Sequence, residues 1–290
     1  MNCSDFFKAL GIAALLLGTT AVSAAEVRLT EDGSIKRDPV YIADGKQLVY
    51  SVDVSEILMK LVRMDLATKK IEHLRPRANK NEFETAFSSD ERYWAITHNK
   101  SNLAMEMVIV DTKSNKEFKV THSGRGGTRA PVFSPDDKRV IYCFAEKGPQ
   151  QIWSVNLEAK DKKQLSDGQG ISNWPSITPD GKTIVFSTSR HGTYELYAMD
   201  IDGKNARRIT NNNFSEFRPR LSPDGKRIAY VAFDGGDRDV FVMNLDGKNI
   251  RRVTNNPERD DYPSWHPDGK HLVIVSERQG AHDLYLIDVP

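Results

Sequence analysis

A short turn sequence recurs six times along this chain at a nearly constant spacing. Each copy is Pro-Asp-Gly or a close variant, and one aspartate marks the common position: Asp44, Asp90, Asp136, Asp180, Asp224 and Asp268. Successive copies are separated by 46, 46, 44, 44 and 44 residues. Repeats of this length are typical of β-propellers, in which one repeat forms one four-stranded blade. The spacing therefore predicts an all-β, six-bladed propeller with four antiparallel strands in each blade.

The residues that follow each reference aspartate predict buried strands. Positions four to six after it are apolar in every copy, from Leu48-Val-Tyr50 to Leu272-Val-Ile274. A strand that is apolar on both faces must be covered on both, as it is when neighbouring blades enclose it. A further strand, such as Leu196-Tyr-Ala-Met-Asp200, runs into Asp202-Gly203, a strong hairpin signal.

The final repeat reaches Pro290 without an outer strand of its own. Near the N-terminus, Val27-Arg-Leu-Thr30 resembles the outer strands that end at Thr210 and Thr254, and each of these threonines stands 14 residues before its reference aspartate. We therefore expect the N-terminal strand to pair with the last repeat, complete blade 6 and close the ring.

The repeat units resemble those of a known family. Trp174-Pro-Ser-Ile-Thr-Pro-Asp-Gly-Lys182 and Arg218-Pro-Arg-Leu-Ser-Pro-Asp-Gly-Lys226, with their Leu-Tyr-Ala-Met-Asp and Arg-Arg-Ile-Thr continuations, are similar to the WD-repeat-like units of TolB-type propellers. The resemblance covers residues 26–290 and implies a periplasmic protein that works with an envelope lipoprotein of the Pal type. It is less specific for function, because similar propellers serve as gating domains of prolyl oligopeptidase-like and tricorn-type proteases and as the body of oligogalacturonate lyases. TolB carries an extra N-terminal domain, so we expect a propeller-only relative here.

Residues 1–25 have the features of a secretory signal peptide. Residues 9–18 form an apolar run that follows Lys8 and precedes small residues through Ala25, and the run is too short to span a bilayer. We therefore expect export to the periplasm, with secretion as an alternative, and a propeller over residues 26–290. The net charge of +1 offers no field for binding nucleic acid. Cys143 lies in an apolar strand sequence and is predicted to be a core residue.

The segments that enter each innermost strand are expected to line the mouth of the central channel. They mix arginine, aromatic and acidic residues, and the first two types dominate the energetics of protein interfaces. An alternative interpretation is that the aromatic residues only fill space between blades while the charges pair around the rim. The predicted partner-binding residues are Arg37, Asp38, Phe83, Glu84, Arg129, Trp174, Phe217, Arg218, Asp261 and Tyr262.

The sequence contains neither the Gly-x-Ser-x-Gly motif of serine hydrolases nor the His-Glu-x-x-His motif of zinc proteases. The mouth segments contain no histidine, and their arginines disfavour calcium, so neither a metal nor a cofactor is predicted there. His266, beside Asp268, is interpreted as a satisfied turn residue. The favoured function is a monomeric, non-catalytic scaffold that binds an envelope protein. The alternative is a polysaccharide-binding or polysaccharide-cleaving propeller, with Trp174 or Tyr262 stacking on sugar and Glu84 and Asp261 as acid and base.

Overall fold

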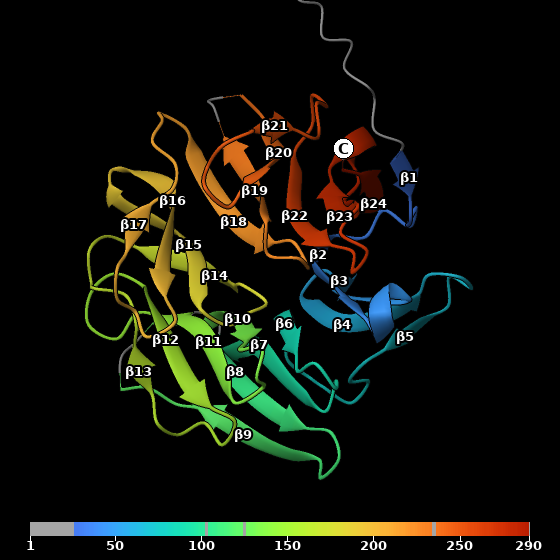
Figure 1. Ribbon diagram of the computed structural model, residues 1–290. Helices are drawn as coiled ribbons and strands as arrows, with labels where there is room; N and C mark the ends of the chain where they lie inside the picture. The colour runs from blue at the N-terminus through green and yellow to red at the C-terminus, as the bar shows by residue number, and fades with distance from the viewer. Residues whose placement is uncertain (1–25, 102–103, 124–125, 234–235, 290) are drawn as a thin grey trace, which may run out of the picture.

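The computed structural model describes residues 26–101, 104–123, 126–233 and 236–289. These residues form six four-stranded antiparallel sheets arranged as blades around a central axis (Figure 1), which confirms the predicted fold. The helical segments within the described ranges are two single 3-10 turns, Ala43–Gly45 and Arg278–Gly280. No helix of this part of the chain has the length and apolar character that crossing a membrane requires. The predicted signal peptide, residues 1–25, lies outside the described residues.

Blades 1 to 5 each consist of four strands that follow one another in the chain, from the channel outward. Blade 1 contains β2 (Lys36–Ile42), β3 (Gln47–Ser55), β4 (Leu58–Asp65) and β5 (Ile71–His73). Blade 2 contains β6 (Glu82–Phe87), β7 (Tyr93–Ser101), β8 (Ala104–Asp111) and β9 (Lys116–Val120). Blade 3 contains β10 (Arg129–Phe133), β11 (Arg139–Phe144), β12 (Gln151–Asn156) and β13 (Lys163–Gln164). Blade 4 contains β14 (Ser172–Ile177), β15 (Thr183–His191), β16 (Thr193–Asp200) and β17 (Arg207–Arg208). Blade 5 contains β18 (Ser215–Leu221), β19 (Arg227–Phe233), β20 (Arg238–Asn244) and β21 (Arg251–Arg252).

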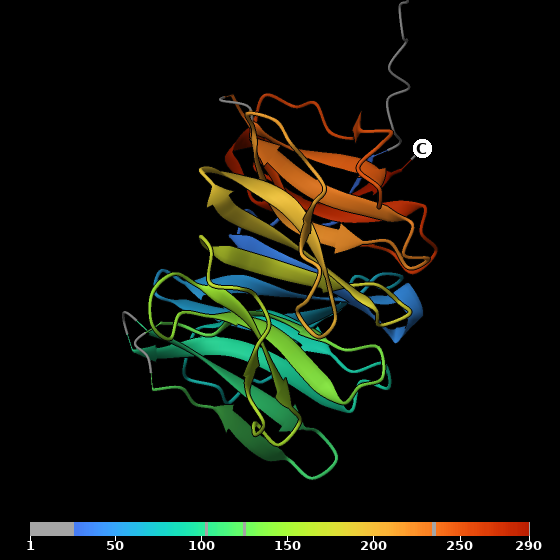
Figure 2. The same cartoon turned by 60° about the vertical axis from the view of Figure 1, so that its left-hand side comes forward.

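Neighbouring blades pack face to face, as the turned view in Figure 2 shows, and the core lies between them. The apolar residues four to six positions after each reference aspartate are buried there as predicted, except Trp94, which is partly exposed. Tyr50, Tyr142 and Tyr230 occupy the same repeat position and are almost fully buried. Cys143 is also fully buried, which confirms its assignment to the core.

The recurring aspartate folds the turn between the first two strands of a blade. In blade 4, the hydroxyl of Thr178 donates to Oδ1 of Asp180 at 2.6 Å, and the backbone N–H of Lys182 donates to the same oxygen at 3.1 Å. Gly181 follows with a φ of 69°, a conformation that glycine adopts without steric cost. Blades 2, 3 and 5 repeat the hydroxyl contact at 2.6 Å with serine in place of threonine. Blades 2 to 5 therefore share one turn chemistry, whereas blade 1 forms a 3-10 turn at Ala43–Gly45 and blade 6 has His266 in place of the hydroxyl residue.

Blade 6 is completed by the N-terminal strand. It contains β22 (Asp260–Trp265), β23 (His271–Ser276), β24 (Asp283–Asp288) and, outermost, β1 (Glu26–Arg28), which pairs antiparallel with β24. Figure 1 shows β1 beside β24 at this closure. Thr30 accepts the N–H of Leu284 at 3.0 Å and donates to Asp283 at 2.8 Å. Thr254 makes the equivalent contacts with Val240 and Asp239 in blade 5, which explains the shared 14-residue spacing.

A buried ion pair joins blade 6 to blade 1 at the closure. Lys36 is fully buried, and its Nζ lies 3.2 Å from Oδ1 of Asp283, which is also buried. Lys36 pairs in addition with Asp32, and Asp283 pairs with Arg28 at 2.6 Å. Blades 5 and 6 carry a buried acid at the repeat position of Lys36, in the form of Glu216 and Asp260.

Replacing Asp283 with asparagine should destabilise the ring by roughly 3 kcal/mol, because it leaves the ammonium group of Lys36 buried beside a weaker partner. Urea unfolding measures this loss. Asp202→Asn is the matched control, because its ion pair with Lys204 is exposed and should contribute little to stability. Equal effects of the two substitutions would contradict the importance of the closure pair.

Candidate functional site

Every innermost strand contains a β-bulge at the same repeat position. In blade 4 the pairing register with the second strand shifts between Asn173 and Ser176, and each of the other five blades shows the corresponding shift. The residue six positions before the reference aspartate has a positive φ in all six blades. These residues, with their φ angles, are Asp38 (51°), Glu84 (34°), Ala130 (50°), Trp174 (53°), Arg218 (51°) and Tyr262 (55°).

A left-handed conformation costs a non-glycine residue roughly 1–2 kcal/mol. The six residue types share no preference for it, so the propeller imposes it on whatever side chain stands there. Proline follows in five blades, at Pro39, Pro131, Pro175, Pro219 and Pro263. The innermost strand tolerates proline because its channel edge has no sheet partner to accept an N–H. Strained positions of this kind concentrate at functional sites, and here five of the six are predicted mouth residues.

Arginine and aromatic side chains form one half of the mouth, in blades 4 to 6. The guanidinium carbon of Arg218 lies 4.1 Å from the ring centre of Tyr262 and 5.0 Å from that of Trp174. Phe217 packs edge-on against Trp174, with ring centres 5.7 Å apart. Tyr194, which the sequence analysis did not select, contacts both of these rings. A cation between two aromatic faces stabilises the cluster and holds its geometry.

Asp261 binds this cluster to the neighbouring loops. Its carboxylate lies 3.2 Å from Arg218, 3.2 Å from Arg238 and 2.6 Å from Arg259. Burial would raise the pKa of this carboxyl, but the charges of Arg218 and Arg259 hold it below its usual range. Asp261 therefore remains ionised, and its ion pairs with the three arginines hold their side chains in place. Arg238 was not selected from the sequence, because it lies at the start of β20, outside the segments that enter the innermost strands.

Carboxyl groups line the other half of the mouth. Glu84 accepts hydrogen bonds from Nη2 of Arg129 and from the backbone N–H of Ala130, both at 2.8 Å. Burial would raise the pKa of Glu84, yet the charge of Arg129 keeps it below the usual value. Asp38 differs: burial and the negative charge of Glu84 raise its pKa to about 7.

Arg220 is a further channel residue that the sequence analysis missed. Its charge acts on Asp38, and its own environment includes the charges of Arg218 and Glu84. Burial lowers the pKa of its guanidinium. Comparison of the repeats could have identified Arg220, because it is the one large charged residue at this repeat position. The other five blades carry small residues there: Val40, Ala86, Val132, Ser176 and Ser264.

The structure thus brings together eight of the ten predicted residues in two groups. Arg37 is exposed and makes no ion pair with the other eight within the described ranges, although its charge acts on Tyr262. Phe83 is half-buried, and in the same ranges no ring contact links it to them. Glu84 and Asp261, considered above as an acid and base pair, are both held ionised by arginines. Neither is poised to donate a proton near neutral pH. The arrangement instead presents fixed charges and aromatic faces to an incoming group.

A ring of six four-stranded blades defines the class of this protein as a six-bladed β-propeller. The model of the TolB beta propeller domain matches residues 87–235, which are 149 of the 290 residues. The chain therefore belongs to the TolB β-propeller domain family. The Tricorn protease N-terminal beta propeller domain also matches, over residues 195–288. No curated protein sequence matches the chain.

Solved structures show the same fold. A protein from Agrobacterium tumefaciens assigned as TolB is 20% identical, with 91% of this chain and 97% of that chain covered and a TM-score of 0.71. TolB from Acinetobacter baumannii is 19% identical, with 86% and 65% covered and a TM-score of 0.66. Oligogalacturonate lyase from Vibrio parahaemolyticus is 17% identical, with 93% and 95% covered and a TM-score of 0.62. At these identities the likeness concerns the fold alone.

Asp38 should make stability depend on pH in a defined window. Its pKa is about 7 in the folded protein and about 4 when unfolded, so the folded state loses stability as pH rises between these values. Asp38→Asn, which stays neutral, should therefore gain about 1–2 kcal/mol over the parent at pH 8 and little at pH 4. Urea unfolding across this range tests the change, with the exposed hairpin variant Asp246→Asn as control. A difference that is independent of pH would contradict the neutral state of Asp38.

Proposed function

We propose that this protein is a non-catalytic periplasmic propeller whose channel mouth binds an envelope protein. The observation that carries the proposal is the set of side chains that the six left-handed positions hold at the mouth. Arg218 between Trp174 and Tyr262, fixed by Asp261, is a preorganised arrangement of the residue types that contribute most to protein interfaces. Preorganisation reduces the entropy lost when a partner binds.

Exposed apolar side chains around the mouth support a protein partner. In each blade, the first strand begins and the second strand ends at the mouth face. Six large apolar residues lie exposed at or next to these ends, in the loops and strand termini: Ile35, Val54, Ile57, Ile171, Phe214 and Phe233. Ile57 is 86% exposed. Apolar groups around a polar centre are typical of surfaces that dock another protein.

The charges indicate which chemistry the partner should present. Five arginines meet three carboxyl groups in this cluster, and one of the arginines, Arg259, also pairs with Glu277 at 3.3 Å. Because the pKa of Asp38 is raised to about 7, a fraction of this carboxyl is neutral near that pH. A partner segment that carries a carboxylate would balance the excess of positive charge. Membership of the TolB propeller family and the expected signal peptide favour a partner in the cell envelope, with a Pal-like lipoprotein as the first candidate. The arginines are Arg129, Arg218, Arg220, Arg238 and Arg259, and the carboxyl groups belong to Asp38, Glu84 and Asp261.

A glycan is the second candidate ligand. The fold is shared with oligogalacturonate lyase, and the rings of Trp174 and Tyr262 at the mouth are suited to stacking on sugar. The ionised states of Glu84 and Asp261 favour binding over hydrolysis, because a glycosidase needs one protonated carboxyl group.

Crosslinking of the purified protein in envelope extract tests the proposal. The variant Ile57→Ser/Phe214→Ser/Phe233→Ser removes apolar surface at the mouth face and should reduce capture of a defined envelope protein by about tenfold or more. A second variant, Arg129→Ala/Trp174→Ala/Tyr262→Ala, should have a similar effect while leaving the Arg218–Asp261 pair in place.

The matched control changes Ile71, Ile201 and Ile250 to serine, because these residues are also exposed but lie next to the hairpins at the opposite face. Circular dichroism and melting curves establish that all variants are folded. Capture that is equal in the parent, control and mouth variants would overturn the proposal. Binding of an acidic polysaccharide that depends on Trp174 and Tyr262, without protein capture, would favour the second candidate.

A further inference from the structure

Two histidines occupy one turn on the face opposite the mouth. In blade 6 this turn reads His266-Pro-Asp-Gly-Lys-His271. The position of His266 is held by serine or threonine in blades 2 to 5, and the position of His271 by Tyr93, Arg139, Thr183 and Arg227. The turn itself does not require histidine at either place. The sequence analysis interpreted His266 as a satisfied turn residue, and the structure brings both histidines onto one carboxylate.

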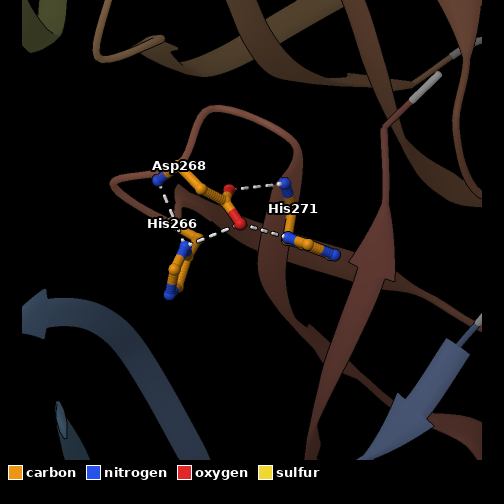
Figure 3. Close-up of side chains that lie close together, drawn as sticks. All are labelled: His266, Asp268 and His271. Carbon is orange, nitrogen blue, oxygen red and sulfur yellow. Dashed lines mark hydrogen bonds and ion pairs between the residues drawn. The ribbon is translucent and has the colours of Figure 1, made fainter. Parts of the chain in front are cut away.

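Figure 3 shows both imidazole rings directed at Asp268. Nδ1 of His266 lies 3.1 Å from Oδ2 of Asp268, and Nδ1 of His271 lies 2.6 Å from the same oxygen. One ligand atom from each of the three residues lies within 4.8 Å of the other two. The side chains are only about one-quarter to one-third exposed, and the N–H of His266 donates to the carbonyl of His271 at 2.9 Å. The strand pair therefore holds both rings in place.

Nδ1 of each ring faces the carboxylate of Asp268, and in the metal-free geometry the 2.6 Å contact with His271 requires a proton on Nδ1 of His271. The backbone N–H of Asp268 donates to Nδ1 of His266 at 3.2 Å, so this nitrogen is an acceptor. Nε2 of His271 lies 3.2 Å from Oδ1 of Asp288, which is positioned to accept its N–H when a cation replaces the proton on Nδ1. A carboxylate behind the outer nitrogen is the usual support of a metal-binding histidine. A proton on His271 gives only one of the two Nδ1 atoms a favourable contact with Asp268, whereas one cation could bind both Nδ1 atoms and the carboxylate.

We propose that His266, Asp268 and His271 form a binding site for a divalent cation of the zinc class. Two imidazole nitrogens and one carboxylate oxygen suit Zn²⁺, with a fourth position left for water, and do not suit Mg²⁺ or Ca²⁺. Zinc bonds of about 2.0–2.2 Å require the ligand atoms to separate slightly further than they do here. The partly exposed ring of His271 has room to move outward by that amount.

The site lies at the seam where the ring closes. The ring of His266 packs edge-on against Tyr41 of blade 1, with centres 4.9 Å apart. A side chain at Gly45, also in blade 1, would come within 2.5 Å of Nε2 of His266. A bound cation would fix His266 against both residues. We therefore expect the metal to stabilise the contact between the first and last blades.

Calorimetric titration of the untagged full chain with Zn²⁺ tests this site. We expect one ion per chain and a higher melting temperature with Zn²⁺ than with Mg²⁺. His266→Ser introduces the serine that blades 2, 3 and 5 carry at this position, and His271→Arg introduces the arginine of blades 3 and 5. Both variants should therefore fold. Each should weaken zinc binding by about tenfold or more. His73→Gln, in the exposed outer strand of blade 1, is the matched control and should bind normally.

The electronic spectrum of the Co²⁺-substituted protein adds a readout of coordination. Visible absorption bands that disappear in His266→Ser and His271→Arg, but persist in His73→Gln, would support the assigned ligands. Zinc binding that is unchanged in both cluster variants, or absent at 100-fold molar excess of Zn²⁺, would overturn the proposal. Because the mouth lies on the other face, these results do not depend on the proposed function.

Discussion

The structure depends on one long-range strand pairing, that of β1 with β24. All other sheet contacts in the described blades join strands that follow one another in the chain, whereas this pairing joins its two ends. It covers the outer edge of blade 6 and brings Arg28 and Thr30 onto Asp283, while Lys36 reaches the same carboxylate from the start of blade 1. Since each blade is covered only by its neighbours, closure also completes the core between blades 1 and 6. The channel mouth exists as a ring for the same reason.

The mouth combines a constant backbone with variable side chains. The bulge and its left-handed residue recur in every blade, so the fold supplies six equivalent positions around one axis. The chain fills them with a carboxyl pair in blades 1 and 2, alanine in blade 3, and an aromatic–arginine–aromatic series in blades 4 to 6. The two halves of the mouth therefore differ in chemistry although their geometry is the same. Such asymmetry lets one approaching partner be oriented as well as bound.

The repeat was sufficient to predict the blades, the strand order and the closure, because these follow from turn chemistry and burial. Thr30 could be placed from its spacing alone, since it serves the same capping role as Thr210 and Thr254. The left-handed bulge could not be predicted, because its residue types have no common backbone preference and a following proline usually indicates extended chain. The partners of Asp261 also depend on loops from separate hairpins, which spacing does not relate.

Lys36 gives the closure a different response to acid from that of the neighbouring seams. Burial would raise the pKa of Asp283, but Arg28, Thr30 and Lys36 lower it. The contact between blades 6 and 1 is therefore strongest when this carboxyl group is ionised, and it weakens as the pH falls through the pKa of Asp283 in the folded protein. Between blades 4 and 5, Glu216 has a raised pKa because of burial, and between blades 5 and 6 the same is true of Asp239. These two carboxyl groups favour the folded state as they take up protons, whereas the contacts of ionised Glu84 and Asp261 with arginines of neighbouring blades weaken in acid as the closure does. Because the closure alone joins the two ends of the chain, its loss in acid would let the propeller unroll from β1 as a continuous stack of blades.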